Sequence, residues 1–160
     1  MIKIRILFVC TGNICRSPMA EAVFRHLAER ARLADYLAIA SAGTHDYNVG
    51  LEPDDRARRA AAGRGYPMNG MRARQLNQDD FENFHYLLAM DNGNLADLKK
   101  SCPAEYQHKL GLFMEYGTGH RGVEIPDPYP GGKTAFELVL DLVENAAAGL
   151  LEHIRRELNI

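Results

Sequence analysis

The chain has 160 residues, of which 46% are hydrophobic and 25% charged, with a formal net charge of -2 and a pI near 6.3. This size and composition predict one globular domain over residues 1–160 with a substantial buried core. The nearly balanced charge gives no reason to expect a nucleic acid or an anionic membrane as a partner, so any bound anion needs a local site.

The first predicted element is a strand over residues 3–9, an apolar run that contains Lys3 and Arg5. A signal peptide begins in a similar way, but this run stops at Thr11-Gly12-Asn13 without a small-residue cleavage site. No other apolar stretch approaches the roughly 20 residues that cross a bilayer. Three cysteines, an odd number, are more typical of reduced or reactive thiols than of a secreted disulfide framework. We therefore expect a soluble, cytoplasmic protein.

Strands and helices then alternate along the chain. Runs of β-branched or aromatic residues predict strands at 36–41, 84–90 and 109–114, and helical spacing predicts helices from Pro18 to about Leu33, near 54–63, near 92–100 and from Thr134 to about Leu158. This alternation predicts an α/β fold whose mainly parallel sheet is covered on both faces. Ligands of such sheets bind at the carboxyl ends of the strands.

The last helix carries a start signal and an apolar stripe. Thr134 and Glu137 have the spacing of a capping box, which predicts that the helix opens at Thr134, just after Gly131-Gly132. The predicted buried stripe consists of Phe136, Val139, Val143, Ala147, Leu150 and Ile154.

The loop after the first strand has the composition of an anion site. It reads Val9-Cys10-Thr11-Gly12-Asn13-Ile14-Cys15-Arg16-Ser17-Pro18. A tight loop that opens a helix can point several backbone N–H groups at one oxyanion. Gly12 and Asn13 are best able to adopt the positive φ angles that such a loop needs, and Arg16 offers a planar fork for two phosphate oxygens. The loop is not a Walker A motif, because the Gly-Lys-Ser/Thr ending is missing.

Cys10, at the bottom of this loop, is the candidate nucleophile. A thiol must be ionised to attack, and a helix terminus alone contributes only ~0.3 to 1 kcal/mol to that. Several N–H donors, the Arg16 charge and a hydrogen bond from the Ser17 hydroxyl must therefore add to it. A small buried cysteine at a strand end is the alternative, but Gly, Asn, Arg and Ser at these spacings favour the nucleophile.

Several further segments complete a pattern. The loop is followed by Met-Ala-Glu-Ala, and beyond it come Ser41-Ala42-Gly43, Tyr47-Asn48-Val49-Gly50, Ala73-Arg74-Gln75, Met90-Asp91 and Asp127-Pro128-Tyr129. With these, the chain resembles the low-molecular-weight protein tyrosine phosphatase family over nearly its whole length. The resemblance implies a three-layer sandwich with a four-stranded, mainly parallel sheet and helices on both faces. It also implies hydrolysis of phosphotyrosine in two steps through a phosphocysteine.

The implied partners are phosphotyrosine-containing proteins or small aryl phosphates, with phosphate ion as the product. No cofactor is expected. The six histidines are scattered without metal-site spacing, so we also predict no metal.

Asp127 is the candidate general acid. A phenolate leaving group has a pKa of ~10, so its departure at neutral pH is helped by a proton delivered in the transition state. Pro126 and Pro128 stiffen the chain on both sides of Asp127. The segment alone is ordinary turn chemistry, but the resemblance implies that Asp127 protonates the leaving group and later deprotonates the attacking water.

The resemblance also assigns the surroundings of the phosphate. The implied substrate-binding residues are Thr11, Gly12, Asn13, Ile14, Cys15, Ser17, Tyr47 and Tyr129. The two tyrosines would line the cleft, with half-buried packing as the alternative, and Ser41 would brace the loop together with Asn13. Three positions depart from the family: many relatives carry tryptophan at Tyr47, an aromatic residue often stands at Pro130, and Met71 replaces a histidine of the bracing network.

Two features have open interpretations. The resemblance implies that Cys15 can form a disulfide with Cys10 and so protect Cys10 from over-oxidation. The alternative is that Cys15 is a packed thiol. Cys102 is predicted to be structural. An arginine cluster either recruits acidic phosphoproteins or forms a solvated helix face. It consists of Arg56, Arg58, Arg59, Arg64, Arg72 and Arg74.

Two rival functions remain. Arsenate reductases of a related family share this loop but need a closely spaced cysteine pair further along, where this chain has only Cys102. A non-catalytic phosphate-binding module needs neither a thiolate nor an acid, so Cys10 and Asp127 argue against it.

Overall fold

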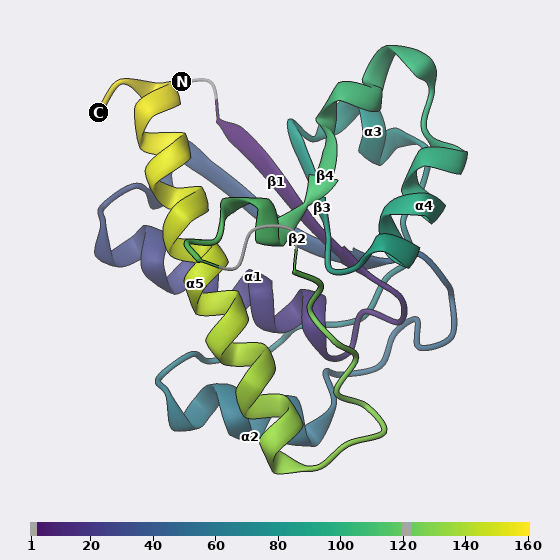
Figure 1. Cartoon of the computed structure of the whole chain (residues 1–160), viewed down its shortest axis with the longest axis vertical. Helices are drawn as coiled ribbons and strands as arrows, with labels where there is room; N and C mark the ends of the chain where they lie inside the picture. The colour runs from purple at the N-terminus through teal and green to yellow at the C-terminus, as the bar shows by residue number, and fades with distance from the viewer. Residues whose placement is uncertain (1–2, 120–122) are drawn as a thin grey trace.

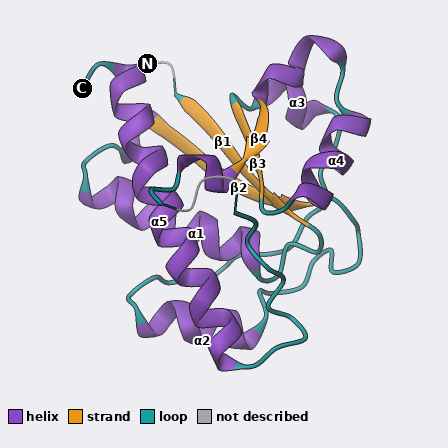
Figure 2. Cartoon of the chain, in the orientation of Figure 1, coloured by secondary structure: helices purple, strands orange, loops and turns teal. Residues whose placement is uncertain are grey.

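The computed structural model describes residues 3–119 and 123–160, so His120, one of the six histidines, lies outside them. Within the described residues, four strands form one sheet: β1 (Ile4–Cys10), β2 (Leu37–Gly43), β3 (Tyr86–Ala89) and β4 (Leu110–Leu112) (Figure 2). The strand order is β2-β1-β3-β4, and every neighbouring pair is parallel. The predicted strands and the four-stranded parallel sheet are confirmed.

Helices cover both faces of this sheet (Figure 1). On one side lie α1 (Arg16–Arg30) and α5 (Lys133–Leu158), with α2 (Asp55–Gly63) packed against both. On the other side lie α3 (Asp79–Asn83) and α4 (Asn92–Ser101). Short 3-10 helices connect the elements at Ala34–Tyr36 (η1), Ala104–Lys109 (η2) and Phe113–Tyr116 (η3). The three-layer α/β prediction is therefore confirmed.

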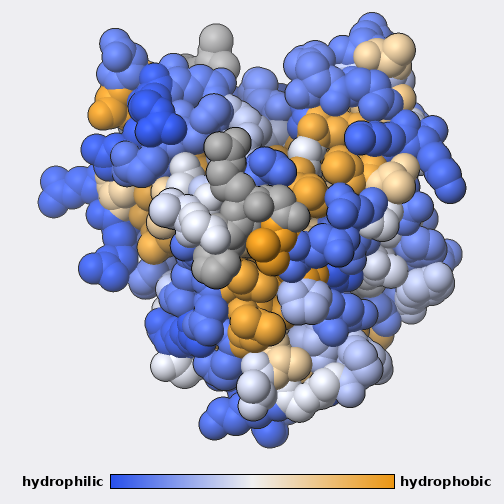
Figure 3. Space-filling model, in the orientation of Figure 1, coloured by the Kyte–Doolittle hydropathy of each residue, from blue (hydrophilic) through white to orange (hydrophobic). Residues whose placement is uncertain are grey.

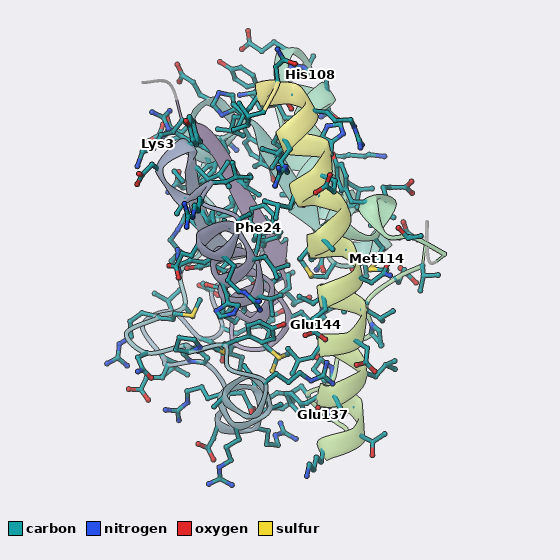
Figure 4. All side chains as sticks on the ribbon, turned by 90° about the vertical axis from the view of Figure 1, so that its left-hand side faces the viewer. Lys3, Phe24, His108, Met114, Glu137 and Glu144 are labelled. Carbon is teal, nitrogen blue, oxygen red and sulfur yellow. The ribbon has the colours of Figure 1, made fainter. Side chains whose placement is uncertain are left out.

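Strand β1 separates two hydrophobic cores, because successive side chains point to opposite faces. Phe8 packs edge-on against Phe24 and Phe113, with ring centroids 5.8 and 4.9 Å apart, in the core under α1 and α5. Figure 4 shows Phe24 and Met114 of this core beside α5. Leu7 and Val9 belong to the second core, under α4. Burial on both faces explains why β1 is almost continuously apolar, and it fixes Cys10 at the end of a rigid strand.

The structure corrects the predicted start of α5. Gly132 is the N-cap residue and no side chain caps the helix, so Thr134 already lies inside it and the predicted capping box was wrong. The reason is the turn at Gly131-Gly132: the extended backbone of Gly132 lets its carbonyl accept the first helical hydrogen bond, from Ala135 N. The predicted apolar stripe is confirmed, since all six of its residues are buried.

The surface in the view of Figure 3 is mostly hydrophilic, with apolar residues gathered near its middle and towards its upper right. Among residues 3–119 and 123–160, no helix combines the length and the apolar character that a membrane crossing requires.

Candidate active site

The predicted phosphate loop connects the end of β1 at Cys10 to the start of α1 at Arg16. It therefore lies at the carboxyl edge of the parallel sheet, where Cys10 pairs with Gly43 of β2. The loop lines a cavity of about 310 Å³. The lining residues are Cys10, Thr11, Gly12, Asn13, Ile14, Cys15, Arg16, Tyr47, Asn48, Asp127 and Tyr129. Of the predicted nucleophile, anion clamp, acid and substrate-binding residues, only Ser17 is not in this lining; it lies buried behind Cys10.

The backbone of the loop confirms one of the two conformations expected for it. Asn13 has a φ of 57°, in the left-handed region, as predicted. Gly12 does not have a positive φ, so that prediction was wrong. A Cβ atom at Gly12 would lie 2.4 Å from Asn48 Nδ2, which donates to the Gly12 carbonyl at 3.2 Å, so a larger residue here would displace the Asn48 amide. Asn48 was not predicted as a site residue, because its contact is with backbone.

The sulfur of Cys10 is buried, with 2% of the residue exposed, and lies 2.9 Å from the Ser17 hydroxyl. The direction of this hydrogen bond follows from the groups around it. Arg74 N donates to Asn13 Oδ1 at 3.0 Å, which orients the Asn13 amide, and Asn13 Nδ2 donates to Ser17 Oγ at 2.8 Å. Because Ser17 Oγ accepts from Asn13, its own proton points either at the sulfur, 2.9 Å away, or at the Ala42 carbonyl, 3.4 Å away, and the shorter contact favours the sulfur.

The bracing of the loop continues beyond Asn13. Asn13 Nδ2 also donates to Ser41 Oγ at 3.0 Å, which agrees with the predicted contact between these residues. Ser41 donates in turn to Glu21 Oε1 at 2.7 Å, and Arg25 forms an ion pair with Glu21 at 2.8 Å. Met71 lies beside this network, where it lines a cavity of about 180 Å³. The network therefore continues through Glu21 to Arg25, without a polar group from Met71.

Arg16 is also buried, with 3% of the residue exposed. Its Nη1 donates to Asp91 Oδ2 at 2.7 Å and to the Ile125 carbonyl at 2.9 Å, and its Nη2 lies 3.5 Å from Thr11 Oγ1. Asp91 is itself fixed as the N-cap of α4. These contacts hold the plane of the guanidinium within the cavity wall. The role of Asp91 was missed, although Met90-Asp91 was part of the pattern.

The other wall of the cavity is exposed. Asp127 accepts a hydrogen bond from Tyr129 N at 3.0 Å in a local turn. Tyr47 and Tyr129 are 69% and 55% exposed, so half-buried packing does not explain them. Tyr47 stacks on His45 with ring centroids 4.9 Å apart, and Pro130 is exposed beside Tyr129. This wall brings an acid and two aromatic rings to the mouth of a buried anion pocket.

The two loop cysteines have different surroundings. Cys15 is the N-cap residue of α1, and burial, followed by the nearby Asp54 carboxylate, raises its pKa to about 12. Cys15 is therefore a thiol at neutral pH. Both cysteines are free, and their oxidation to a disulfide stays a prediction. Burial also raises the pKa of Cys102, which is consistent with the predicted structural role.

The arginine cluster is neutralised by carboxylates. Its ion pairs are Arg56 with Asp54, Arg58 with Glu52 and Asp55, Arg59 with Asp55, Arg64 with Glu137, Asp141 and Glu144, Arg72 with Glu52, and Arg74 with Asp80. Figure 4 shows Glu137 and Glu144 on the side of α5 towards α2. The arrangement favours a solvated, paired surface over a recruiting patch for acidic proteins.

The parallel sheet, with a Cys-x5-Arg loop at its carboxyl edge and an aspartate facing that loop, has the arrangement of the cysteine-dependent phosphatases. The chain belongs to the low molecular weight phosphotyrosine protein phosphatase family, whose model matches residues 5–160. It is thus a hydrolase of the protein tyrosine phosphatase class.

Individual relatives agree with this assignment. A low molecular weight protein-tyrosine-phosphatase of Streptomyces coelicolor is 41% identical over 96% of this chain and 94% of its own. The crystal structure of a protein tyrosine phosphatase from Entamoeba histolytica has a TM-score of 0.94 and 37% identity, covering 97% of this chain and 99% of that one. A structure of YwlE, an arginine phosphatase, has a TM-score of 0.85 and 28% identity over 95% of this chain and 96% of its own; it carries a phosphorylated active-site serine in a mutant.

Proposed function

We propose that this phosphatase hydrolyses phosphotyrosine with Cys10 as the nucleophile, Arg16 as the clamp on the phosphate oxygens and Asp127 as the general acid. The observation that carries the proposal is that Asp127, more than a hundred positions further along the chain, lines the same cavity as Cys10 and Arg16 of the phosphate loop. Binding alone would not require a cysteine, an arginine and an aspartate to meet there.

In the first step, the Cys10 thiolate attacks phosphorus in line with the ester oxygen. The backbone N–H groups of the loop and the Arg16 guanidinium stabilise the negative charge that a loose transition state spreads over the three remaining phosphate oxygens. Asp127 gives its proton to the departing phenolate oxygen, so tyrosine leaves neutral. The Ser17 hydroxyl, 2.9 Å from the sulfur, stabilises the thiolate before the attack.

In the second step, water attacks the phosphocysteine from the side that the leaving group has vacated. Asp127, now ionised, accepts a proton from this water, and Cys10 leaves as a thiolate that Ser17 again stabilises. Phosphate ion is the product. The phosphorylated active-site serine of the YwlE mutant supports a covalent intermediate at the equivalent place in a relative.

The substrate class follows from the walls above the phosphate loop. Ile14, Tyr47 and Tyr129 present apolar and aromatic surface to the cavity, which suits the flat ring of an aryl phosphate. Phosphotyrosine-containing proteins or small aryl phosphates are therefore the proposed substrates. Phosphoarginine, the substrate class that the name of YwlE indicates, carries a guanidinium rich in N–H donors, for which the side chains of Ile14, Tyr47 and Tyr129 offer few acceptors.

We also propose Cys15 as the reserve thiol of a redox switch. Its position in the lining of the same cavity as Cys10 supports this role. After peroxide converts Cys10 to a sulfenic acid, condensation with the Cys15 thiol would form a disulfide and release water. Activity lost to excess peroxide should return with dithiothreitol in the wild type and remain lost in Cys15→Ser, where the unprotected sulfenic acid is oxidised further to a sulfinic acid that dithiothreitol does not reduce.

The test of the substrate class compares one peptide that carries either phosphotyrosine or phosphoarginine. We expect kcat/KM for the phosphotyrosine peptide to be higher by about tenfold or more, the size of discrimination that unmatched polar groups produce. Equal rates, or a preference for phosphoarginine, would contradict the proposed substrate class.

A further inference from the structure

Arg56 contacts both the segment that carries Asp127 and a residue bonded to the phosphate loop. It lies in the first turn of α2, and its side chain is 40% exposed. Its Nε and Nη2 donate to the two carboxylate oxygens of Asp54, at 3.1 and 3.0 Å. Its Nη1 donates to the Gly131 carbonyl at 2.9 Å, and its guanidinium carbon lies 5.2 Å from the centre of the Tyr129 ring and 4.7 Å from that of Phe136.

The Asp54 side of this contact leads to the phosphate loop. The backbone N–H of Asp54 donates to the Ile14 carbonyl at 2.8 Å, in the middle of that loop. Arg56 thereby connects the loop that carries Cys10 to the segment 125–132, which carries Asp127 and which we call the acid loop. The bidentate pair with Asp54 lowers the pKa of this carboxyl, so the connection is ionised at neutral pH.

The acid loop is held near each end. At Ile125, the backbone N–H donates to the Met90 carbonyl at 2.9 Å and the carbonyl accepts from Arg16. At Gly131, the carbonyl accepts from Arg56. Asp127 lies between these two points. Among the described residues, the Asp127 side chain accepts a hydrogen bond only from Tyr129 N, in its own turn. The place of the Asp127 carboxylate therefore depends on how the two ends are anchored.

A guanidinium suits this role better than an ammonium does. One flat group pairs with Asp54 along one edge, donates to Gly131 from another and stacks against aromatic rings with its faces. A lysine ammonium has neither the fork nor the faces. Arg56 is also absent from the described residues that line the active-site cavity, so its effect on the reaction passes through the acid loop or, by way of Asp54, through the phosphate loop.

We propose that Arg56 is a positioning residue that holds Asp127 over the phosphate loop. The inference rests on the proposed role of Asp127 as the general acid. A misplacement of about 1 Å can cost a catalytic group ~10²-fold in rate, so loss of the anchor at Gly131 affects the steps that need the Asp127 proton and spares those that do not.

The test measures kcat/KM for a series of aryl phosphates whose phenols differ in pKa. Arg56→Met keeps an apolar stem against Phe136 but removes the guanidinium; Arg56→Lys keeps the charge. For both, we expect a loss of about tenfold to a hundredfold for phenols of high pKa and less than about twofold for phenols of low pKa. Arg59→Met is the matched control: this arginine lies on the same helix, pairs with Asp55 and has an 80% exposed side chain, so it should behave as the wild type.

A second comparison separates positioning from folding. In an Asp127→Ala background, Arg56→Met should cause no further loss, because the group it positions is gone. Inhibition by inorganic phosphate should stay unchanged in Arg56→Met, which would show that the phosphate loop is intact. If Arg56→Met does not fold, Arg56→Lys carries the same comparison.

The outcomes are distinct. The role of Arg56 would be overturned if Arg56→Met lowered kcat/KM equally for all phenols. It would also be overturned if Arg56→Met lowered kcat/KM by the same factor in the Asp127→Ala background as in the wild type. If Asp127→Ala itself loses the same factor for every phenol, the general acid assignment fails, and the inference fails with it. If Asp127→Ala discriminates between phenols and Arg56→Met does not, only the inference fails.

Discussion

The phosphate loop and the mouth of the cavity are built in opposite ways. Cys10, Asn13, Arg16 and Ser17 are at most 3% exposed and bonded to one another or to the neighbouring strands and helices. At the mouth, Tyr47 and Tyr129 are more than half exposed. If the proposed roles hold, the phosphate is recognised by a buried, hydrogen-bonded network, and the rest of the substrate by exposed side chains at the mouth.

The difference has an energetic basis. A buried polar group without a partner costs ~1 to 3 kcal/mol, so each member of the loop network depends on the others. Substitution of an exposed side chain usually changes stability by less than ~0.5 kcal/mol. Changes in the loop should therefore affect both folding and chemistry, and changes at the mouth chemistry alone.

The largest effect is expected from Cys10→Ser. Serine has a similar size, but its hydroxyl stays protonated at neutral pH and is a poor nucleophile. We expect kcat to fall by about 10⁴-fold or more, in the range seen when other enzymes lose their nucleophile. Steady-state hydrolysis of an aryl phosphate measures this, with phosphate binding as the control for an intact loop. Retained turnover would mean that another group attacks phosphorus.

Asp127→Ala tests the exposed side of the comparison. General acid catalysis contributes ~10² to 10⁴-fold, so kcat/KM should fall by that amount for phenols of high pKa and little for phenols of low pKa. The thermal unfolding midpoint should not change, because Asp127 is exposed and bonds only within its turn among the described residues. A large drop in stability would show that the mouth is as tightly built as the loop.

Substitutions of Asn13 test the buried phosphate loop. Asn13→Ala removes hydrogen bonds to Ser17 and Ser41 and leaves a side chain that tolerates the φ of 57° poorly. We expect the free energy of unfolding to fall by about 2 to 4 kcal/mol, measured by urea unfolding. Asn13→Gly keeps the backbone conformation and should recover about 1 kcal/mol of this. Identical losses in the two variants would show that backbone strain does not matter here.

At neutral pH, the ionisation of Cys15 gives the smallest effect. Its folded pKa, raised from 9.0 to about 12, means that the folded state holds this proton more tightly than the unfolded state does. The corresponding stability is fully present below pH 9 and is lost as the pH rises towards 12. The decline in stability over this range should be shallower in Cys15→Ala than in the wild type. Parallel profiles would show that burial does not raise the pKa of Cys15.

The sequence predicted the fold well because its signals are local. Buried runs and helical spacing located the four strands and most of the helices, and Val9 to Pro18 carries the phosphate loop in consecutive residues. The five-residue helix α3 was missed because it is too short for periodicity. The start of α5 was misplaced because the turn at Gly132 competes with the capping signal of Thr134.

The site contacts that the sequence did not predict join segments that are far apart in the chain. Asp91 and Glu21 stood within the matched motifs, but their contacts with Arg16 and Ser41 depend on how β3 and α1 pack against β1 and β2. Asn48 and Arg56 act on backbone carbonyls, which leave no pattern in the sequence. Gly12 was predicted to have a positive φ, which it does not adopt; it lies against the Asn48 amide instead.

The most direct test of the account is to trap the intermediate. Asp127→Ala is mixed with an aryl phosphate whose phenol has a low pKa, so that the first step stays fast while the second lacks its base, and the reaction is stopped within milliseconds. The account predicts a burst of phenol equal to the enzyme concentration, with the phosphoryl group on the Cys10 sulfur in mass spectra of the peptides. A burst without phosphate on Cys10, or a phosphoryl group on another residue, would contradict it.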